Sequence, residues 1–266
     1  MRVVRPGCRA AGPRRPRYPA TVDGQRVDEG DWVPINVVIL AAGMGTRLGR
    51  PHPKPLTPLA DGRSILRQQL DHLRAAFGAD AHITIVVGFK MDLIMEAAAT
   101  DAAFVYNELY DQTNTCKSLL KALRLAPPGD VLWLNGDVVF VPGLLDALMP
   151  QVRKGRTFVA VNTDSVADEE VKYTVDADGY VKELSKEVTD ALGEAVGINF
   201  VAASDRAVLV RHLDACDDGD YFERAIETAI ADDGLRVAAV DISAYGCVEV
   251  DFEPDLARAN ALELHR

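Results

Sequence analysis

The sequence predicts an α/β fold in which a Rossmann-like, mixed and mostly parallel sheet is flanked by helices and carries a small added sheet. Apolar runs of strand length alternate with amphipathic stretches from residue 36 to residue 134, a pattern typical of β–α–β units. Several closely spaced strand-like runs follow in the second half of the chain. Polar turns containing glycine follow the first strand and a later one, where sheets of this kind bind ligands.

The first half of the chain is predicted to form the parallel part of the sheet. Its expected strands are short apolar runs at Asn36–Leu40, His82–Val87, Ala103–Tyr106 and Val131–Leu134. Its expected helices are amphipathic stretches at Ser64–Phe77, Met91–Ala99 and Lys117–Leu125. Because helices separate the strands, neighbouring strands are expected to run in the same direction.

The pattern changes after Pro142–Leu148. Strands are expected at Thr157–Val161, Val171–Val175, Tyr180–Leu184 and Ala195–Val201, and D-A-D-G at 176–179 is expected to form a hairpin turn between the middle two. The remaining expected elements are helices at Asp205–Leu213 and Tyr221–Ile230, a strand at Leu235–Val240, an extended C-V-E-V-D at 247–251 and a last helix from about Pro254. We assign these added strands to acceptor binding.

Residues 35–266 are predicted to form a single domain, because no repeat or linker interrupts them. Residues 1–34 are rich in Arg and Pro and lack apolar periodicity. They also lack the apolar core of a secretory signal, so we expect a disordered arm or a misassigned start.

The composition narrows the range of partners and compartments. A net charge of −11 argues against nucleic acid or an anionic membrane as partner, and no apolar run is long enough to cross a bilayer. Cys8, Cys116, Cys216 and Cys247 lack the spacing of a metal site. They are therefore interpreted as reduced thiols of a cytoplasmic protein.

The most informative segment is the turn after the first strand. Residues 38–48 are V-I-L-A-A-G-M-G-T-R-L, and residues 53–56 are P-K-P-L. Gly43 and Gly45 allow backbone N–H groups to approach phosphate oxygens, Arg47 adds a fork of donors and Lys54 a mobile charge. The turn lacks the third glycine of a dinucleotide-binding fingerprint and the Lys of a Walker loop. It therefore predicts a different kind of nucleoside triphosphate site.

Acidic residues lie at the ends of two other strands. Asp137 follows Val131–Leu134 and a glycine, and Glu249 and Asp251 are two positions apart, so they point to the same side of an extended strand. Two such carboxylate groups would suit Mg²⁺, which takes its remaining ligands from water and phosphates. A purely structural turn at Gly136-Asp137 is equally compatible with these residues alone.

These motifs resemble the signature of the nucleotidyltransferases that make NDP-sugars, CDP-choline and CDP-inositol. N-G-D-V-V-F resembles the family's metal-binding G-D motif, and E-V-D-F-E-P-D-L its late E-x-D motif. The resemblance implies a GT-A-like nucleotidyltransferase fold, catalytic roles for Arg47 and Lys54, and Mg²⁺ ligation by Asp137, Asp251 and Glu249. It also implies nucleotide contacts from the loop residues Leu40, Ala41, Ala42, Gly43, Gly45 and Thr46.

A second stretch resembles the phosphocholine and inositol-phosphate cytidylyltransferase branch. N-E-L-Y at 107–110, T-N-T at 113–115 and S-L at 118–119 are similar to that branch's N-x-x-Y, N-N and S-L elements. The resemblance favours CTP and implies nucleotide contacts from Asn114 and Ser118. Thr115 stands where the branch often has a second asparagine, which leaves the base open.

The acceptor region carries a weaker resemblance. Lys172 and Lys186 are similar to residues that hold the acceptor's phosphate in this branch. G-E-A-V-G at 193–197, which contains Glu194, is similar to a G-E-x-x-G element that lies near the acceptor in the family. From the residues alone, solvated strand positions are the better interpretation of both lysines, because Lys is seldom buried. A choline acceptor would need an aromatic cage, and neither tryptophan lies in the second half of the chain. This favours a polyol, cyclitol or sugar phosphate over phosphocholine.

The sequence thus predicts a Mg²⁺-dependent enzyme, a cytidylyltransferase-like nucleotidyltransferase. It would condense CTP, or another NTP, with a small phosphorylated alcohol (a polyol, cyclitol, choline or sugar phosphate) and release pyrophosphate. Its expected partners are these small molecules, without nucleic acid or membrane, and a homodimer is one expected assembly. Three alternatives remain open: a sugar- or cyclitol-phosphate enzyme using GTP, UTP or ATP, a non-catalytic regulatory module, and a glycosyltransferase, whose usual D-x-D motif is not evident.

Overall fold

The computed structural model describes residues 21–22, 25–26, 35–164, 166 and 169–262. The chain divides into two units, Met1–Val33 and Pro34–Arg266. In the first unit, β1 (Thr21–Val22) pairs antiparallel with β2 (Gln25–Arg26). Otherwise, the prediction of a disordered arm or a misassigned start at residues 1–34 falls almost wholly outside the described residues.

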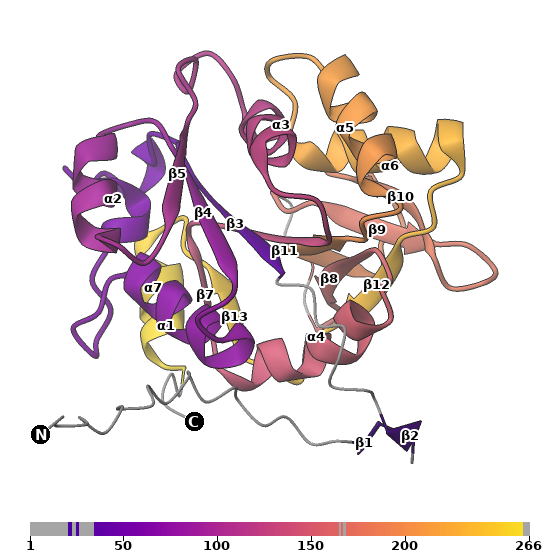
Figure 1. Cartoon of the computed structure of the whole chain (residues 1–266), viewed down its shortest axis with the longest axis horizontal. Coiled ribbons are helices and arrows are strands. Elements are labelled where there is room, and N and C mark those ends of the chain that lie inside the picture. The colour runs from indigo at the N-terminus through magenta and orange to yellow at the C-terminus, as the bar shows by residue number, and fades with distance from the viewer. Residues whose placement is uncertain (1–20, 23–24, 27–34, 165, 167–168, 263–266) are drawn as a thin grey trace, which may run out of the picture. The chain divides into compact units, whose positions relative to one another are not determined.

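The second unit is built on a mixed sheet with the strand order β10-β9-β11-β6-β3-β4-β5 (Figure 1). Its parallel part consists of β3 (Asn36–Ala41), β4 (His82–Val87), β5 (Ala103–Tyr106) and β6 (Val131–Asn135). Short apolar runs joined by helices thus form the predicted parallel strands, with β3 at their centre.

The strands of the second half continue the same sheet. They are β8 (Phe158–Asn162), β9 (Lys172–Val175), β10 (Val181–Ser185), β11 (Gly193–Val201) and β12 (Ala238–Asp241). The long strand β11 pairs antiparallel with β6, β8 and β9, and β12 pairs parallel with β8. The added strands therefore extend the central sheet through β11 and do not form a separate sheet, because β11 is long enough to pair on both sides.

Helices cover both faces of the sheet. Alternate residues of β3 point to opposite faces, so Val37 and Ile39 pack with α1 (Ile65–Phe77), α2 (Met91–Ala98) and α4 (Gly143–Arg153). Val38 and Leu40 pack on the other side with the three remaining sheet-covering helices, α3 (Thr115–Leu125), α5 (Arg206–Ala215) and α6 (Phe222–Asp233). This two-sided burial explains why β3 is apolar at successive positions.

A small second sheet lies beside α1. In it β7 (Val138–Phe140) pairs antiparallel with β13 (Cys247–Glu249), and α7 (Glu253–Asn260) follows. Leu48 packs with Val139 and Val250 in a separate apolar cluster. This cluster fixes the segment after β3 against the end of β13, although Leu48 and Val250 are 202 positions apart in the chain.

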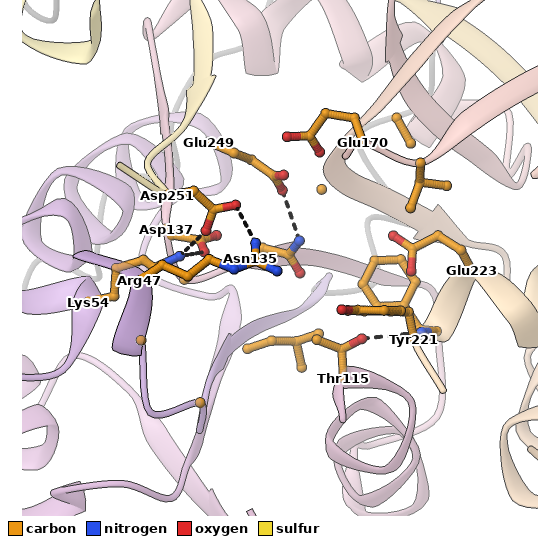
Figure 2. Close-up of a pocket in the computed structure, with 18 of the residues that line it drawn as sticks. Arg47, Lys54, Thr115, Asn135, Asp137, Glu170, Tyr221, Glu223, Glu249 and Asp251 are labelled. Atoms are coloured by element: carbon orange, nitrogen blue, oxygen red, sulfur yellow. Dashed lines mark hydrogen bonds and ion pairs between the residues drawn. The ribbon is translucent and has the colours of Figure 1, made fainter. Parts of the chain in front are cut away.

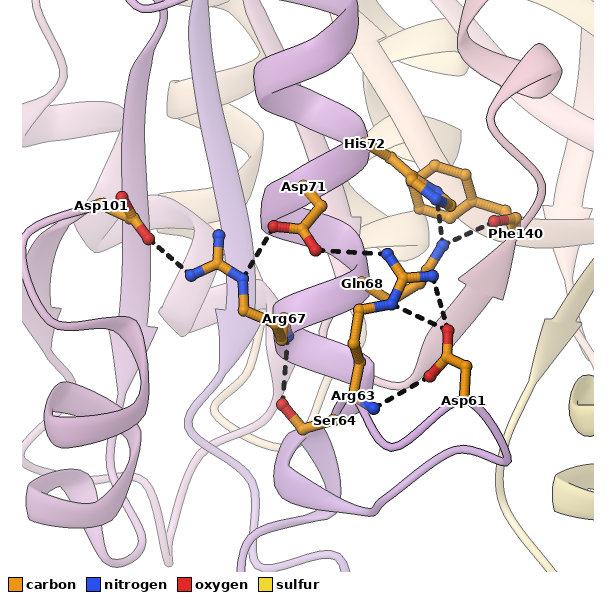
Figure 3. A network of polar contacts seen from close by, with 9 residues as sticks. All are labelled: Asp61, Arg63, Ser64, Arg67, Gln68, Asp71, His72, Asp101 and Phe140. Carbon is orange, nitrogen blue, oxygen red and sulfur yellow. Dashed lines mark hydrogen bonds and ion pairs between the residues drawn. The ribbon is translucent and has the colours of Figure 1, made fainter. Parts of the chain in front are cut away.

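The segment that leads into α1 is held by a network of ion pairs (Figure 3). Arg63 contacts Asp61 at 2.7 Å and Asp71 at 3.2 Å, and Arg67 contacts Asp71 at 2.9 Å and Asp101 at 2.6 Å. The Oγ of Ser64 accepts a hydrogen bond from the N–H of Arg67 and caps the helix. Partly exposed pairs each contribute little to stability, but the network orients the segment directly after Lys54–Leu56.

Within the described residues, no helix combines the length and apolar character that crossing a membrane requires. The described cysteines, Cys116, Cys216 and Cys247, are free thiols.

Candidate functional site

A cleft of about 220 Å³ opens at the carboxyl ends of β3 and β6 (Figure 2). The basic residues Arg47 and Lys54 lie at one end, after β3, and carboxylates from β13, α6 and the segment before β9 line the rest. We call the end that contains Arg47 and Lys54 the triphosphate end. The opposite end, around Glu170 and Glu223, is called the acceptor end. The cleft lies where ligands bind in open α/β sheets.

The turn after β3 brings backbone to the edge of the cleft. Gly45 has a φ of +58°, which a side chain would strain, and a Cβ there would lie 3.0 Å from the Cβ of Lys54. Gly43 does not share this conformation, but a Cβ on it would have no atom within 4 Å, so open space adjoins its backbone. Of the loop residues expected to contact the nucleotide, Leu40, Ala41, Gly43 and Gly45 line the cleft, whereas Ala42 is buried. The side chain of Thr46 lies outside what the structure describes.

Lys54 is the centre of the charged contacts at the triphosphate end. Its Nζ lies 2.8 Å from Oδ2 of Asp137 and 2.5 Å from Oδ1 of Asp251, and only 11% of the side chain is exposed. Burial acts to lower the pKa of Lys54, but the two carboxylates outweigh it and raise the pKa above its usual value. The lysine therefore carries a full charge at neutral pH.

The two carboxylates reach Lys54 through the small sheet. Asp137 lies between β6 and β7, and the N–H of Val250 donates to its backbone oxygen at 3.1 Å, which places Asp251 beside it. Arg47 donates to Oδ2 of Asp251 at 3.1 Å. Burial acts to raise the pKa of Asp251, but Lys54 and then Arg47 reverse this and hold it below its ordinary value. The structure thus brings together the four charged residues that the motifs predicted.

These carboxylates suit a divalent cation in part. Oδ1 of Asp137 is buried and has no hydrogen-bond partner among the described residues, so a cation would supply the contact it lacks. No three His, Cys, Asp or Glu side chains of the described residues gather into a complete metal site. Two carboxylates with further ligands from water and phosphate are the arrangement that Mg²⁺ takes in nucleotide sites.

Glu249 has a different environment from Asp251. Its Oε1 accepts a hydrogen bond of 2.9 Å from Nδ2 of Asn135. Gly197 makes room for this contact: it has a φ of +66°, and a Cβ there would lie 2.2 Å from Oε1 of Glu249. Burial, together with Asp137 and Glu170, raises the pKa of Glu249. Both acidic side chains line the cleft, as their spacing predicted, but Glu249 does not join Asp137 and Asp251 in a three-carboxylate cluster.

The acceptor end contains residues that the sequence did not single out as site residues. They are Glu170, Glu223, Thr115 and Tyr221, which all line this end of the cleft (Figure 2). Burial, reinforced by the charge of Glu194, raises the pKa of Glu170. Glu223 is 8% exposed, and burial raises its pKa to about 7. The sequence offered one signal for Glu223, an acidic residue near the start of a predicted amphipathic helix. Acidic residues are common at that position because they interact favourably with the helix dipole, so the signal did not indicate a site.

The predicted acceptor residues are only partly in the cleft. Lys186 lines it, with Nζ 4.9 Å from the centre of the Tyr221 ring. Lys172 does not line it, and its Nζ donates to the backbone oxygen of Lys186 at 3.5 Å. Glu194 lies on β11 opposite Lys172 and is outside the lining residues.

Asn114 and Ser118 have structural contacts instead of a place in the cleft. Asn114 caps α3, accepting from the N–H of Thr115 at 2.8 Å. Ser118 is buried and accepts a hydrogen bond from Asn107, which also donates to Thr113. The N-x-x-Y to S-L stretch therefore organises the turn between β5 and α3, and Thr115 is the member that reaches the cleft.

Comparison with known proteins identifies the family of this chain. A family model for the MobA-like NTP transferase domain matches residues 37–218. The CMP-5'-(3-aminopropyl)phosphonate synthase of Streptomyces rubellomurinus is 31% identical over 250 residues, which is 86% of this chain and 39% of that protein. The bifunctional protein GlmU of Paraburkholderia phytofirmans is 34% identical over 218 residues, 76% of this chain and 46% of that protein. The chain thus spans less than half the length of these curated relatives.

Solved structures share the fold. The CTP:phosphocholine cytidylyltransferase of Streptococcus pneumoniae superposes with a TM-score of 0.68 at 20% identity, covering 86% of this chain and 98% of that one. The inositol-1-phosphate CTP transferase of T. maritima gives 0.66 at 14% identity, covering 85% and 96%. At these identities the likeness concerns the fold, a mixed and partly parallel sheet flanked by helices.

Proposed function

Because the chain belongs to the MobA-like NTP transferase family, we propose that it is a nucleotidyltransferase that moves CMP from CTP to a small phosphate monoester or phosphonate. The observation that carries the proposal is the contact of Lys54 with both Asp137 and Asp251 at the mouth of the glycine turn. The same cleft continues from these charged residues to the acceptor end, which is lined by other residues, including Glu170 and Glu223. A donor and an acceptor can therefore lie in one cleft, close enough to react.

The triphosphate end supplies charge and positioning. The backbone at Gly43 and Gly45 offers close approach to phosphate oxygens, Lys54 a buried positive charge and Arg47 a half-exposed guanidinium. In this assignment Lys54 and Arg47 exchange a carboxylate partner for phosphate oxygens when the nucleotide binds. Their charge then stabilises the negative charge that accumulates on the departing pyrophosphate.

Asp137 and Asp251 are the residues that would hold Mg²⁺, supported by the unsatisfied Oδ1 of Asp137. The ion would neutralise phosphate charge. We assign no such role to Glu249, because Asn135 already binds its carboxylate.

The reaction needs little acid–base chemistry from the protein. An oxygen of the acceptor's phosphate or phosphonate attacks the α-phosphorus of the nucleotide, a new P–O bond forms, and the bond to the bridging oxygen breaks to release pyrophosphate. The nucleophile is already ionised at neutral pH, so no general base is required. Catalysis then rests on alignment of the two substrates and on electrostatic stabilisation.

Two observations favour CTP as the donor: the Streptomyces relative is a synthase of a CMP-linked phosphonate, and the 107–119 stretch resembles cytidylyltransferases. The main alternative is GTP, UTP or ATP with a sugar or cyclitol phosphate. A regulatory module without turnover is the second, and the buried contacts of Lys54 with two carboxylates argue against it, because binding alone does not require them.

The test is pyrophosphate release with Mg²⁺, crossing the four NTPs with phosphocholine, inositol-1-phosphate, glucose-1-phosphate, phosphoethanolamine and an aminoalkyl phosphonate. We expect release with CTP and one acceptor class, and a loss of at least about a hundredfold in kcat for Asp137→Asn. Asp146→Asn, on α4 and outside the cleft, is the matched control. Normal turnover of Asp137→Asn would contradict the assigned role, and turnover with another NTP alone would contradict the choice of CTP.

A further inference from the structure

The acceptor end of the cleft has an excess of negative charge. Glu170, Glu223 and Glu249 line it (Figure 2). Lys186 also lines the cleft, and its positive charge acts on Glu170 and Glu223. We propose that this end binds a primary ammonium group of the acceptor through Glu223, so that the acceptor is a zwitterionic aminoalkyl phosphonate or phosphate. This inference rests on the proposed function and specifies its substrate class.

Glu223 carries the argument because one oxygen of its carboxylate lacks a hydrogen-bond partner among the described residues. The side chain is 8% exposed, lines the cleft, and its Oε2 has no hydrogen-bond partner among the described residues. A buried carboxylate oxygen that is left unsatisfied destabilises the protein unless something else contacts it. A ligand ammonium supplies both the missing hydrogen bond and the opposite charge.

The neighbouring side chains do not balance the negative charge of Glu223. Lys186 is close enough to lower the pKa of Glu223, but burial and Glu170 act in the opposite direction and the pKa rises to about 7. The Nζ of Lys186 lies instead over the Tyr221 ring, 4.9 Å from its centre. In the cleft without ligand, the carboxylates therefore repel one another, and a cationic group relieves this repulsion.

The aromatic residues distinguish a primary ammonium from a quaternary one. A quaternary ammonium cannot donate hydrogen bonds and requires several aromatic faces. Tyr221 is the exposed aromatic ring here, and Lys186 already covers it. Phe222 is 1% exposed and packs edge-on against Trp133, while Tyr173 is buried in the core. Carboxylates, not rings, are available to the ligand, which favours a group with N–H donors.

The cleft as a whole fits a molecule with opposite charges at its two ends. Lys54 and Arg47 lie at one end and Glu170 and Glu223 at the other (Figure 2). An acceptor whose anionic group faces the nucleotide can direct its ammonium group away from Lys54 and toward Glu223. Reversing this orientation would place each charge beside a like charge, so the cleft also fixes the acceptor's direction.

The experiment compares acceptors that differ only in the amine. (2-Aminoethyl)phosphonate and ethylphosphonate are measured by calorimetric binding and by CMP transfer from CTP, in the native protein, Glu223→Gln and Glu227→Gln. Glu227 lies one turn further along α6, pairs with Arg224 and is outside the cleft, so it is the matched control. We expect the native protein and Glu227→Gln to favour the amine at least about tenfold, and Glu223→Gln to lose most of that preference, as for a hydrogen bond to a charged group.

The outcomes separate this inference from the proposed function. Preferential binding of the amine that depends on Glu223, without CMP transfer, would support the ammonium site and overturn the proposed function. CMP transfer to both acceptors alike would support the function and overturn the ammonium site. If Glu223→Gln weakened the binding of both acceptors equally, Glu223 would have a structural role, and the proposed ammonium site would be wrong. Stronger binding of phosphocholine than of phosphoethanolamine would overturn the choice of a primary ammonium.

Discussion

Lys54 links the stability of the protein to the chemistry proposed for it. The lysine lies between two carboxylates that are each about a quarter exposed. Without it, Asp137 and Asp251 would face each other with Arg47 as their remaining basic contact at this end. The same pair of carboxylates is proposed to hold Mg²⁺, so the lysine and a bound cation can compensate for each other.

Replacing this lysine tests that relationship. We expect Lys54→Met to lower the free energy of unfolding by about 1–3 kcal/mol in EDTA, less than the loss for a fully buried pair because the carboxylates keep some solvent. Millimolar Mg²⁺ should recover part of the loss, since a cation can replace the missing charge. Urea denaturation with and without Mg²⁺ measures both effects, and the exposed Lys154→Met is the control. Equal losses in EDTA and Mg²⁺ would contradict metal binding at this pair.

Glu223 predicts a dependence of stability on pH. Its pKa in the folded protein is about 7 against an ordinary value of 4.5, so the folded state holds the proton more tightly than the unfolded state does. The resulting stabilisation is fully present below pH 4.5, the pKa of this group in the unfolded chain, and is lost as the pH rises through 7. The free energy of unfolding falls by about 3 kcal/mol at most over this range. Glu170 raises this pKa and Lys186 lowers it, and neither reverses the sign.

Glu223→Gln mimics the protonated side chain at every pH. We expect it to be more stable than the native protein by about 1–3 kcal/mol near pH 8 and nearly equal to it near pH 5. Urea denaturation at the two pH values, with Glu227→Gln alongside, provides the measurement. A difference that does not change with pH would show that the carboxylate is not buried as described.

These residues also show what sequence could and could not predict. The triphosphate end was predictable because its groups lie in short local motifs around Gly43, Lys54 and Asp137, whose chemistry is specific. Glu223 was not, because an acidic residue in the first turn of a helix is common and its burial depends on packing against distant strands. Ser118 is the opposite case: its motif was noticed, and the structure places its hydroxyl outside the cleft, where it accepts a hydrogen bond from Asn107.

At the scale of elements, the irregularity in β11 shapes the site. The pairing of β11 with β8 shifts register between Ala195 and Asn199, and Gly197 lies in this interval with a positive φ. Such bulges redirect a strand and its side chains. Here the bulge leaves space for Glu249 and Asn135 to meet.

A pair of glycine substitutions can separate backbone strain from crowding at the site. Gly197→Ala and Gly179→Ala both place a side chain at positive φ, which costs about 1–2 kcal/mol. Only the first also places a Cβ 2.2 Å from Glu249, while the second has open space. We therefore expect Gly197→Ala to have the lower free energy of unfolding of the two variants, measured by chemical denaturation. Gly197→Ala should also lose most of its turnover, whereas the turnover of Gly179→Ala should stay near that of the native protein. Equal effects would mean that crowding at Glu249 does not matter.

Element boundaries were mostly predictable, and the exceptions have physical causes. Periodicity located α1, β4 and β5 closely, because apolar spacing and turn residues agree there. The strand β7 was missed, because three apolar residues directly after the Gly-Asp turn resemble a continuation of the loop. Its partner β13 lies more than a hundred residues away, and no local pattern indicates that pairing.

At the scale of the whole molecule, the second unit has an extensive apolar core of its own. Among the residues whose burial the structure describes, the three apolar clusters have their members between positions 35 and 262. We therefore expect a protein lacking residues 1–33 to keep its melting temperature within about 2 °C and its turnover unchanged. Thermal denaturation and the pyrophosphate assay measure this. A clear loss of stability would show that the first unit contributes to the fold of the second.

The division of the cleft into two ends has an evolutionary consequence. The triphosphate end draws Gly43, Lys54 and Asp137 from positions 43 to 137 and Asp251 from the C-terminal segment, whereas the acceptor end draws Glu170, Lys186 and Glu223 from the part of the chain between them. Under the proposed function, mutations between Glu170 and Glu223 would change which molecule is activated and leave these charged residues of the triphosphate end intact. Such an arrangement would let a lineage acquire new products by altering one segment of a gene, and would let an engineer do the same.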